Sequence, residues 1–170
     1  MRITVTDACI FIDLLECHAC EAFFQLSFRV VTSYQVWMEL ENDHREILRQ
    51  WIKNHQLMVI KIEENFVEMT RDENLSRSLS IADRSVWFIS KKEDGILLTS
   101  DGMLRKMAKK HRIDTHGLLW VFDRMVREQL ITTDKAISKL QQIFNRNSYY
   151  RTDSKLTKAF ESLKRKWKKV

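Results

Sequence analysis

The sequence predicts an α/β domain with a mostly parallel central sheet of about five strands and helices on both faces. Short apolar runs alternate with longer segments whose apolar residues recur at helical spacing. This alternation is typical of a parallel sheet whose two faces are covered by helices. Length and composition agree, because 170 residues with 44% hydrophobic and 10% aromatic content suffice for one domain with a real core.

The expected strands are short apolar runs, and the segments between them carry the helical pattern. Gly95 and Gly102 punctuate the ends of the fourth strand, Gly117 leads an apolar helical run, and Thr133 is a good N-cap for a helix that continues to about Phe144. The strands are expected at Ile3 to Val5, Val30 to Thr32, Leu57 to Ile62, Ile96 to Thr99 and Ile113 to Thr115. The helical spacing includes Cys9, Ile10, Ile12 and Leu14, then Val36, Leu40, Ile47, Leu48 and Trp51, then Ile81, Val86, Trp87 and Ile89.

Charge divides the chain into a core region, residues 1–145, and a basic extension, residues 146–170. The extension holds nine Lys or Arg residues against two acidic ones and carries +7, so the remainder of the +6 chain carries −1. Apolar side chains recur through the extension at helical spacing, which predicts a basic amphipathic helix capped by Thr152 or Asp153. One face of this helix could meet phosphates, or the helix could simply be solvated. The apolar residues are Leu156, Phe160, Leu163 and Trp167.

Several functional classes are excluded by missing patterns. No apolar run approaches the 18 or more residues of a membrane span, and the N-terminus does not resemble a signal peptide. The only glycines are Gly95, Gly102 and Gly117, so the sequence has neither a phosphate-binding glycine loop nor a Gly-x-Ser-x-Gly elbow. We therefore expect a soluble chain that is neither a P-loop protein nor a serine hydrolase.

The cysteines predict a reducing, cytoplasmic environment. Cys9, Cys17 and Cys20 are odd in number and clustered near the N-terminus, which disfavours a disulfide framework. Cys17 and Cys20 form a Cys-x-x-Cys pair around His18, which could act in redox chemistry or in a zinc site. No second pair follows at zinc-ligand spacing, so the favoured interpretation is that both are small hydrophobic residues on a helix.

Two aspartates follow predicted parallel strands. Asp7 comes after the first strand, and Asp101 follows the fourth within the run ILLTSDGMLRKMA. Ligands of open parallel sheets bind beyond the carboxyl ends of the strands, where residues distant in sequence meet. These two carboxylates therefore indicate a metal-centred site, although each could equally be only a helix N-cap.

Two further carboxylates lie beside apolar helical faces. Glu39 lies in the run YQVWMELE, in a helix expected to face the sheet, and Asp83 lies early in the apolar helix SLSIADRSVWFI. Acidic residues in such surroundings need a partner, because an unpaired buried charge is costly. A divalent cation is one such partner.

Residues 2–144 resemble a PIN-domain ribonuclease, most closely the small single-domain members typified by prokaryotic toxin–antitoxin toxins. The resemblance lies in the order of Asp7, Glu39, Asp83 in a "Ser-x-x-Asp" helix start and Asp101 in a "Thr-x-Asp" strand end, followed by the glycine-led helix from Gly117. It implies a PIN-like three-layer α/β/α sandwich, with the basic C-terminal helix lying outside the region of similarity.

The resemblance also implies an acidic pocket that holds Mg²⁺ or Mn²⁺ and hydrolyses RNA phosphodiester bonds. Such cations prefer oxygen ligands, can activate a bound water and can neutralise charge on the scissile phosphate. Under this interpretation Asp7, Asp83 and Asp101 share the metal shell, and Glu39 orients the attacking water. Thr99 or Ser100 would support the carboxylates or a phosphate oxygen.

One departure and several basic residues bear on this hypothesis. Members of the family commonly place Ser, Thr or Asn two residues after the first aspartate, where this chain has Cys9, so a supporting polar contact is expected to be weaker. Basic residues next to the acidic positions or in the tail are candidates for binding RNA phosphates, with a plain surface charge as the alternative. They are Arg84, Arg105, Lys106, Lys164, Arg165 and Lys166.

Three classes of function remain open at this point: a metal-dependent endoribonuclease, a catalytically silent PIN-like RNA-binding or assembly module that uses the basic tail, and another Asp-centred α/β protein. The third is disfavoured, because Asp7 is not followed two residues on by the second Asp of haloacid-dehalogenase-type phosphatases, and the acidic residues that receiver domains usually add are also missing. For a toxin, the resemblance further implies a homodimer and an antitoxin peptide that covers the acidic pocket.

Overall fold

The structure, a computed structural model, describes residues 2–62 and 75–168. Its chain divides into two compact units. The first contains residues 1–12 and 27–117, and the second contains residues 13–26 and 118–170. The two units are described separately, and all four predicted acidic site residues belong to the first.

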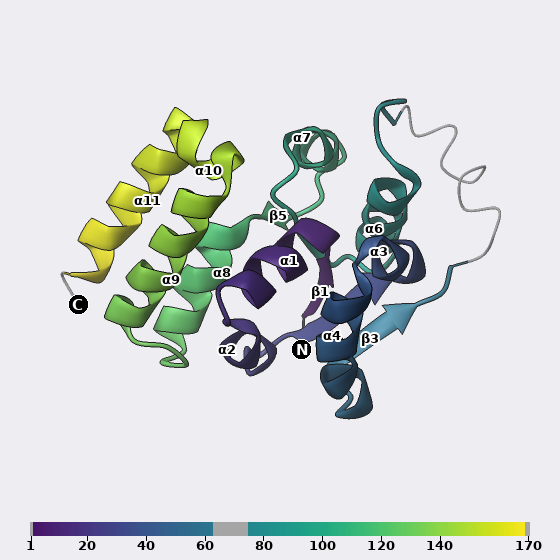
Figure 1. The fold of residues 1–170 in the computed structure, drawn as a ribbon. Helices are drawn as coiled ribbons and strands as arrows, with labels where there is room; N and C mark the ends of the chain where they lie inside the picture. Colours follow the sequence, from purple (N-terminus) through teal and green to yellow (C-terminus); the bar gives the residue numbers. More distant parts are fainter. Residues whose placement is uncertain (1, 63–74, 169–170) are drawn as a thin grey trace. The chain divides into compact units, whose positions relative to one another are not determined.

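The first unit is built on a five-stranded, fully parallel sheet with strand order β3-β2-β1-β4-β5. Figure 1 labels β1, β3 and β5 of this sheet. The predicted α/β class and the mostly parallel sheet of about five strands are therefore confirmed. Because β1 lies at the centre, its carboxyl end is flanked by the ends of β2 and β4. The strands are β1 (Ile3–Thr6), β2 (Arg29–Ser33), β3 (Leu57–Ile60), β4 (Ile96–Leu98) and β5 (Thr115–His116).

Helices of the first unit pack on the sheet through apolar faces. Helix α6 (Ile81–Lys92) contacts β1, β2 and β4, and its Val86 and Trp87 are buried. The other helices are α3 (Tyr34–Glu39), α4 (Asn42–Lys53), α7 (Gly102–Lys110) and the start of α1 (Ala8–Glu16). The core that results packs around β1 and β4, and so positions the residues that follow each strand.

The apolar spacing from Val36 to Trp51 is divided between two helices. Leu40 and Glu41 are both extended, with ψ of 142° and 157°, so α3 ends at Glu39 and α4 begins at Asn42. Leu40 is 2% exposed, and its burial accompanies the turn in the chain. Glu39 consequently occupies the C-terminal end of a six-residue helix.

Differences from the expected strands are confined to their ends. The fifth strand is Thr115–His116 rather than Ile113 to Thr115, because Arg112 has a positive φ of 58° and the Ile113 N–H bonds back to Ala108 O at 2.9 Å. These contacts end α7 and use the Ile113 N–H before the strand starts. The third and fourth strands likewise end at Ile60 and Leu98, short of the predicted limits.

The second unit is entirely helical. Phe144, Tyr150 and Phe160 pack together, with ring centroids 5.3 Å and 4.8 Å from that of Phe144. Thr132, not the expected Thr133, caps α9, whereas Asp153 caps α11 as expected. The helices are α2 (Cys20–Phe24), α8 (Leu118–Arg127), α9 (Thr133–Arg146), α10 (Ser148–Thr152), α11 (Ser154–Trp167) and the last turn of α1. None of the helices in residues 2–62 and 75–168 combines the length and apolar character that crossing a bilayer requires.

Candidate active site

Asp7 is a buried carboxylate at the carboxyl end of the central strand. Its side chain is 5% exposed, and its backbone N–H extends the β1–β4 ladder to Leu98 O at 3.0 Å. Oδ1 accepts from the Ala8 N–H at 2.7 Å, and Oδ2 accepts from Thr99 Oγ1 at 2.7 Å. Burial raises the pKa of Asp7, and the hydrogen bonds from Thr99, Cys9 and Ala8 oppose that rise. The carboxylate is thus held in place from several directions.

Thr99 connects Asp7 to Asp101. Besides donating to Asp7, its Oγ1 accepts from the Asp101 N–H at 3.0 Å, and Thr99 itself is fully buried. Asp101 caps α7 by accepting from the Leu104 N–H at 2.6 Å through Oδ1. Asp101 is exposed, so capping engages one of its oxygens in the protein while the side chain still reaches solvent.

Cys9 makes the contacts that its departure from the family pattern had put in doubt. Its Sγ donates to Asp7 Oδ2 at 3.3 Å and accepts from the Ser100 N–H at 3.2 Å. Burial, followed by the charge of Asp7, raises the pKa of this thiol, so Cys9 stays protonated and can donate. The contact is therefore present, at the longer distances that sulfur imposes.

Glu39 approaches the same region from the end of α3. The pKa of Glu39 is raised first by partial removal of its carboxylate from water and then by the negative charges of Asp7 and Asp83. Asp83 also raises the pKa of Asp7, so three carboxylates from separate parts of the chain lie within electrostatic range of one another. The sequence led us to expect a helix face packed on the sheet at this position. Instead the Glu39 side chain is exposed and Leu40 takes the buried position.

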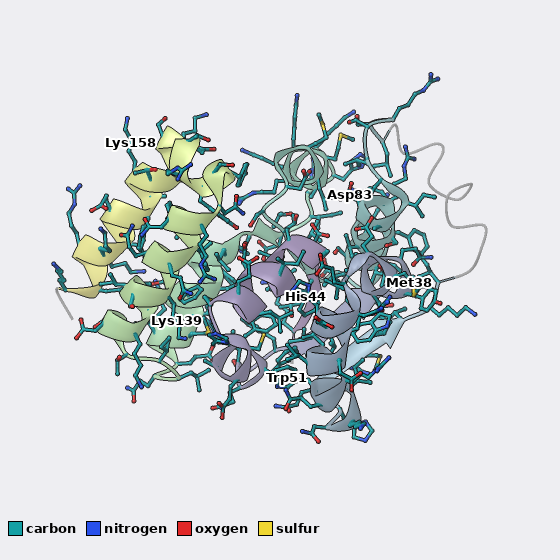
Figure 2. The ribbon with its side chains drawn as sticks, in the orientation of Figure 1. Met38, His44, Trp51, Asp83, Lys139 and Lys158 are labelled. Carbon is teal, nitrogen blue, oxygen red and sulfur yellow. The ribbon has the colours of Figure 1, made fainter. Side chains whose placement is uncertain are left out.

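Asp83 lies at the N-terminal end of α6 (Figure 2). It forms a capping box with Ser80, in which Asp83 Oδ2 accepts from the Ser80 N–H at 2.8 Å and Ser80 Oγ accepts from the Asp83 N–H at 3.0 Å. The cap fixes the direction of the Asp83 side chain through Oδ2.

A serine pair joins the helices that carry Glu39 and Asp83. Ser85 Oγ donates to Ser33 Oγ at 2.6 Å, and Ser33 also accepts from the Val36 N–H at 3.0 Å as the N-cap of α3. Both serines are fully buried. The sequence pattern did not predict this pair, although a Ser in the N-cap position directly after a buried strand is a usable signal for Ser33.

The donor set has the chemistry of a site for a hard cation. Carboxylate oxygens are the ligands that Mg²⁺ prefers. The repulsion by Asp7 and Asp83, which adds to desolvation in raising the pKa of Glu39, would be relieved by a positive charge. In residues 2–62 and 75–168, however, no three His, Cys, Asp or Glu side chains are close enough together to hold a metal ion. The carboxylates thus converge without forming a closed ligand group.

The candidate basic residues differ in what they contact. Arg84 donates to Leu79 O and Ser76 O, and the Arg105 guanidinium lies against Gly117, so close that a Cβ there would be 2.6 Å from Nη1. Lys106 is exposed. In the second unit, Lys164 pairs with Glu161 and Lys166 pairs with Asp123, whereas Arg165 is exposed.

Cys17 and Cys20 behave as small hydrophobic side chains. They are free thiols, 1% and 5% exposed, and burial raises the pKa of Cys17 to about 11 and that of Cys20 to about 12. A thiol with such a pKa is a poor nucleophile at neutral pH. The burial agrees with the favoured interpretation of this pair.

A family model described as a PIN domain matches residues 3–165. The chain belongs to the PIN-domain family. The match continues past residue 144, so it includes α10 and most of α11 in the PIN-domain region. PIN domains are generally nucleases, and they generally use divalent metal ions.

Other comparisons add little to this identification. One solved structure similar to the chain is described as "a domain of a functionally unknown protein" from Methanocaldococcus jannaschii DSM 2661. It shares 24% sequence identity, covers 69% of this chain and 91% of its own, and has a TM-score of 0.47. No curated protein matches the chain.

Proposed function

We propose that this PIN domain is a metal-dependent endoribonuclease that hydrolyses RNA phosphodiester bonds. The observation that supports it most is the convergence of Asp7, Glu39 and Asp83, from three separate elements, at the carboxyl end of a parallel sheet. Open α/β sheets bind ligands at this edge, and like charges brought together in this way favour a cation as their partner.

In the proposed mechanism Asp7, Asp83 and Asp101 would hold Mg²⁺ or Mn²⁺, which supplies charge neutralisation at the scissile phosphate and lowers the pKa of bound water. Asp83 and Asp101 each accept a helix-cap hydrogen bond through one oxygen, which leaves the other for a ligand. Thr99 links Asp7 to Asp101, and Cys9 donates to the same Asp7 oxygen, Oδ2, as Thr99 does.

Glu39 is the proposed general base. Its raised pKa brings the carboxylate closer to the pH of the solution, which improves proton transfer. Glu39 accepts the proton of a water whose oxygen attacks phosphorus, the bond from phosphorus to the leaving oxygen breaks, and that oxygen takes a proton from solvent. Glu39 is exposed at the end of a short helix, so its side chain has room to approach the substrate.

The test is cleavage of a structured RNA pool by the purified chain with Mn²⁺ or Mg²⁺, beside an EDTA control. The double variant Asp7→Asn, Asp101→Asn should lose metal-dependent cleavage, whereas Asp94→Asn, an exposed carboxylate on the turn after α6, should retain it. Circular dichroism would establish that each variant is folded. Full activity in the double variant would contradict the assignment.

The absence of a closed group of three ligands in the described residues favours one alternative, a catalytically silent PIN-like RNA-binding or assembly module. That alternative predicts salt-sensitive RNA binding with no cleavage under any metal. A role as the toxin of a toxin–antitoxin pair, with a homodimer and an antitoxin peptide over the acidic pocket, is a narrower form of the nuclease proposal. It rests on the family resemblance, and induced expression with loss of growth, absent in the double variant, would test it.

A further inference from the structure

Helix α11 uses its apolar face inside the second unit. Phe160 and Trp167 are 2% and 4% exposed, Phe160 packs on Phe144, and Trp167 Nε1 donates to Asp123 Oδ1 at 3.0 Å. An amphipathic helix that binds membranes inserts such a face into the lipid. Because this face is already packed against protein, α11 has only its polar side to offer to a partner.

The basic side chains of α11 fall into two sets. Lys164 lies against Glu161 and over the Phe160 ring, and Lys166 donates to both Asp123 oxygens at 2.9 Å. These two cations neutralise acidic groups of their own unit. They are therefore poorly placed to add charge for a ligand.

The second set comprises Lys155, Lys158 and Arg165, which we call the basic row. All three are exposed, and none has an ion pair with a described residue. Their spacing of i, i+3 and i+10 places them along one side of a helix with 3.6 residues per turn, over about 15 Å. Lys158 lies on the outer side of α11 in Figure 2.

The side chains next to the basic row leave its charge intact. Ser162 falls on the same stripe between Lys158 and Arg165, where its hydroxyl can donate to an anion. The two acidic residues nearest in sequence are already engaged, because Asp153 caps α11 through Oδ1 and Glu161 pairs with Lys164. The solvent side of α11 therefore presents three uncompensated positive charges in a line.

We propose that the basic row binds the phosphate backbone of RNA, independently of the acidic cluster. A line of positive charges spaced along 15 Å is complementary to a chain of phosphates, and Lys side chains recognise phosphate as point charges without reading bases. The choice of RNA rests on the proposed function, since RNA is the substrate there. The contact adds affinity that depends on salt and not on sequence.

The expected effect follows from counterion release. Each phosphate contact to a single strand contributes about 0.7 to the slope of log Kd against log salt, so removing three contacts lowers the slope by about 2. Between 50 and 200 mM salt, the wild-type chain should consequently lose about 20-fold more affinity than a variant without the basic row.

The experiment compares two charge-matched triple variants of the full chain. The first is Lys155→Gln, Lys158→Gln, Arg165→Gln, and the control is Lys53→Gln, Lys92→Gln, Lys110→Gln, three exposed residues at the ends of α4, α6 and α7. Fluorescence anisotropy with a labelled 20-nucleotide RNA in EDTA measures binding without cleavage. We expect weaker binding and a smaller salt slope in the first variant only.

Equal weakening in both variants would show that net charge alone matters, and no weakening in either would show that the basic row does not contact RNA. Both results overturn the proposal. Binding to anionic phosphatidylserine vesicles or to polyglutamate that exceeds RNA binding and depends on the basic row would assign it to another partner, and would also overturn it. Binding of a DNA of the same sequence equal to that of the RNA would support backbone recognition.

Cleavage of a six-nucleotide RNA with Mn²⁺ separates this proposal from the nuclease proposal. The basic-row variant should cleave this short substrate as the wild type does, because the row is not part of the acidic cluster. A chain that binds RNA through the row but cleaves nothing leaves the row assigned and removes the nuclease function. A chain that cleaves RNA, but whose RNA binding does not depend on the basic row, would keep the nuclease function and overturn the assignment of the row.

Discussion

Asp7 and Asp13, on either side of the first half of α1, are equally buried and differ in what surrounds them. They are 5% and 4% exposed, and burial is the largest cause of the raised pKa in both. Asp13 accepts from the Tyr150 hydroxyl, and the acidic residue that raises its pKa is Glu16, one turn along the same helix. Asp7 is opposed by carboxylates from other elements, Asp83 and Glu39.

This difference separates a structural carboxylate from a candidate ligand. Burial and a perturbed pKa are common to both, so neither property identifies a site by itself. Asp13 has hydrogen-bond partners within its own helical unit, Tyr150 and Asn147, so its carboxylate is paired without a cation. Asp7 has donors that position it, yet it lies near the negative charges of Asp83 and Glu39, and a bound cation would relieve this repulsion. Paired substitutions can test whether the two aspartates differ in this way.

The largest effect is expected from the pair Asp7→Asn and Asp13→Asn. Asp7→Asn removes a charged oxygen from the proposed metal shell, and the loss of about 4 kcal/mol of transition-state stabilisation would lower the cleavage rate about 1000-fold. Asp13→Asn should leave the rate within about twofold of wild type. Single-turnover cleavage with saturating Mn²⁺ measures both. A comparable loss in Asp13→Asn would mean that burial, and not convergence, distinguishes the functional carboxylate.

The second effect is a pH dependence of stability at Asp13. Its pKa is raised from 3.8 to about 6, so between these values the folded state binds more protons than the unfolded state, and the free energy of unfolding rises as pH falls. Relative to Asp13→Asn, the wild-type chain should gain about 2 kcal/mol between pH 7 and pH 4.5. Urea unfolding of both proteins across this range isolates Asp13 from other titrating groups. A constant difference would contradict the raised pKa.

Much of the fold could be predicted from the sequence, because short apolar runs for strands alternate with segments whose apolar residues recur at helical spacing. The buried strands and helices of a parallel α/β unit have distinct repeats, and all five strands lie within two residues of their expected positions. The misses are local. The apolar spacing does not reveal the break at Leu40 and Glu41. Leu40 would be an apolar, buried residue in one continuous helix, and it is buried in the observed break as well.

The candidate site likewise has parts that could be predicted from the sequence and parts that could not. Asp7 and Asp101 could be related because parallel strands bring their carboxyl ends to one edge, and the structure links them through the Thr99 hydroxyl. The Ser33–Ser85 hydrogen bond could not be predicted, since a contact between single hydroxyls 52 residues apart leaves no periodic trace. The sequence also did not predict that Glu39 is exposed, because Glu39 is the last residue of α3 and the break after it was not expected.

A third effect compares the hydroxyls that serve the two aspartates. Thr99→Val and Tyr150→Phe each delete one O–H that donates to a buried carboxylate, and each should lower the free energy of unfolding by about 1–2 kcal/mol. Thr99→Val should also reduce cleavage, because Thr99 positions both Asp7 and Asp101. Tyr150→Phe should reduce stability alone. Chemical denaturation and initial cleavage rates, measured on the same preparations, would show whether stability and activity separate as expected.

The smallest effect is expected at Cys9, where serine restores the residue type common in the family. A serine hydroxyl can donate to Asp7 and accept from the Ser100 N–H as the thiol does, so Cys9→Ser should change the free energy of unfolding by less than about 0.5 kcal/mol and retain cleavage. Cys20→Ser is the matched substitution in the helical unit. It places a hydroxyl at a site 5% exposed among apolar side chains, at a cost of about 1–2 kcal/mol. If Cys9→Ser proved the more damaging of the two, the Cys9 thiol would have to act by its size and not as a donor to Asp7, and the polar network around Asp7 would lose one of its members.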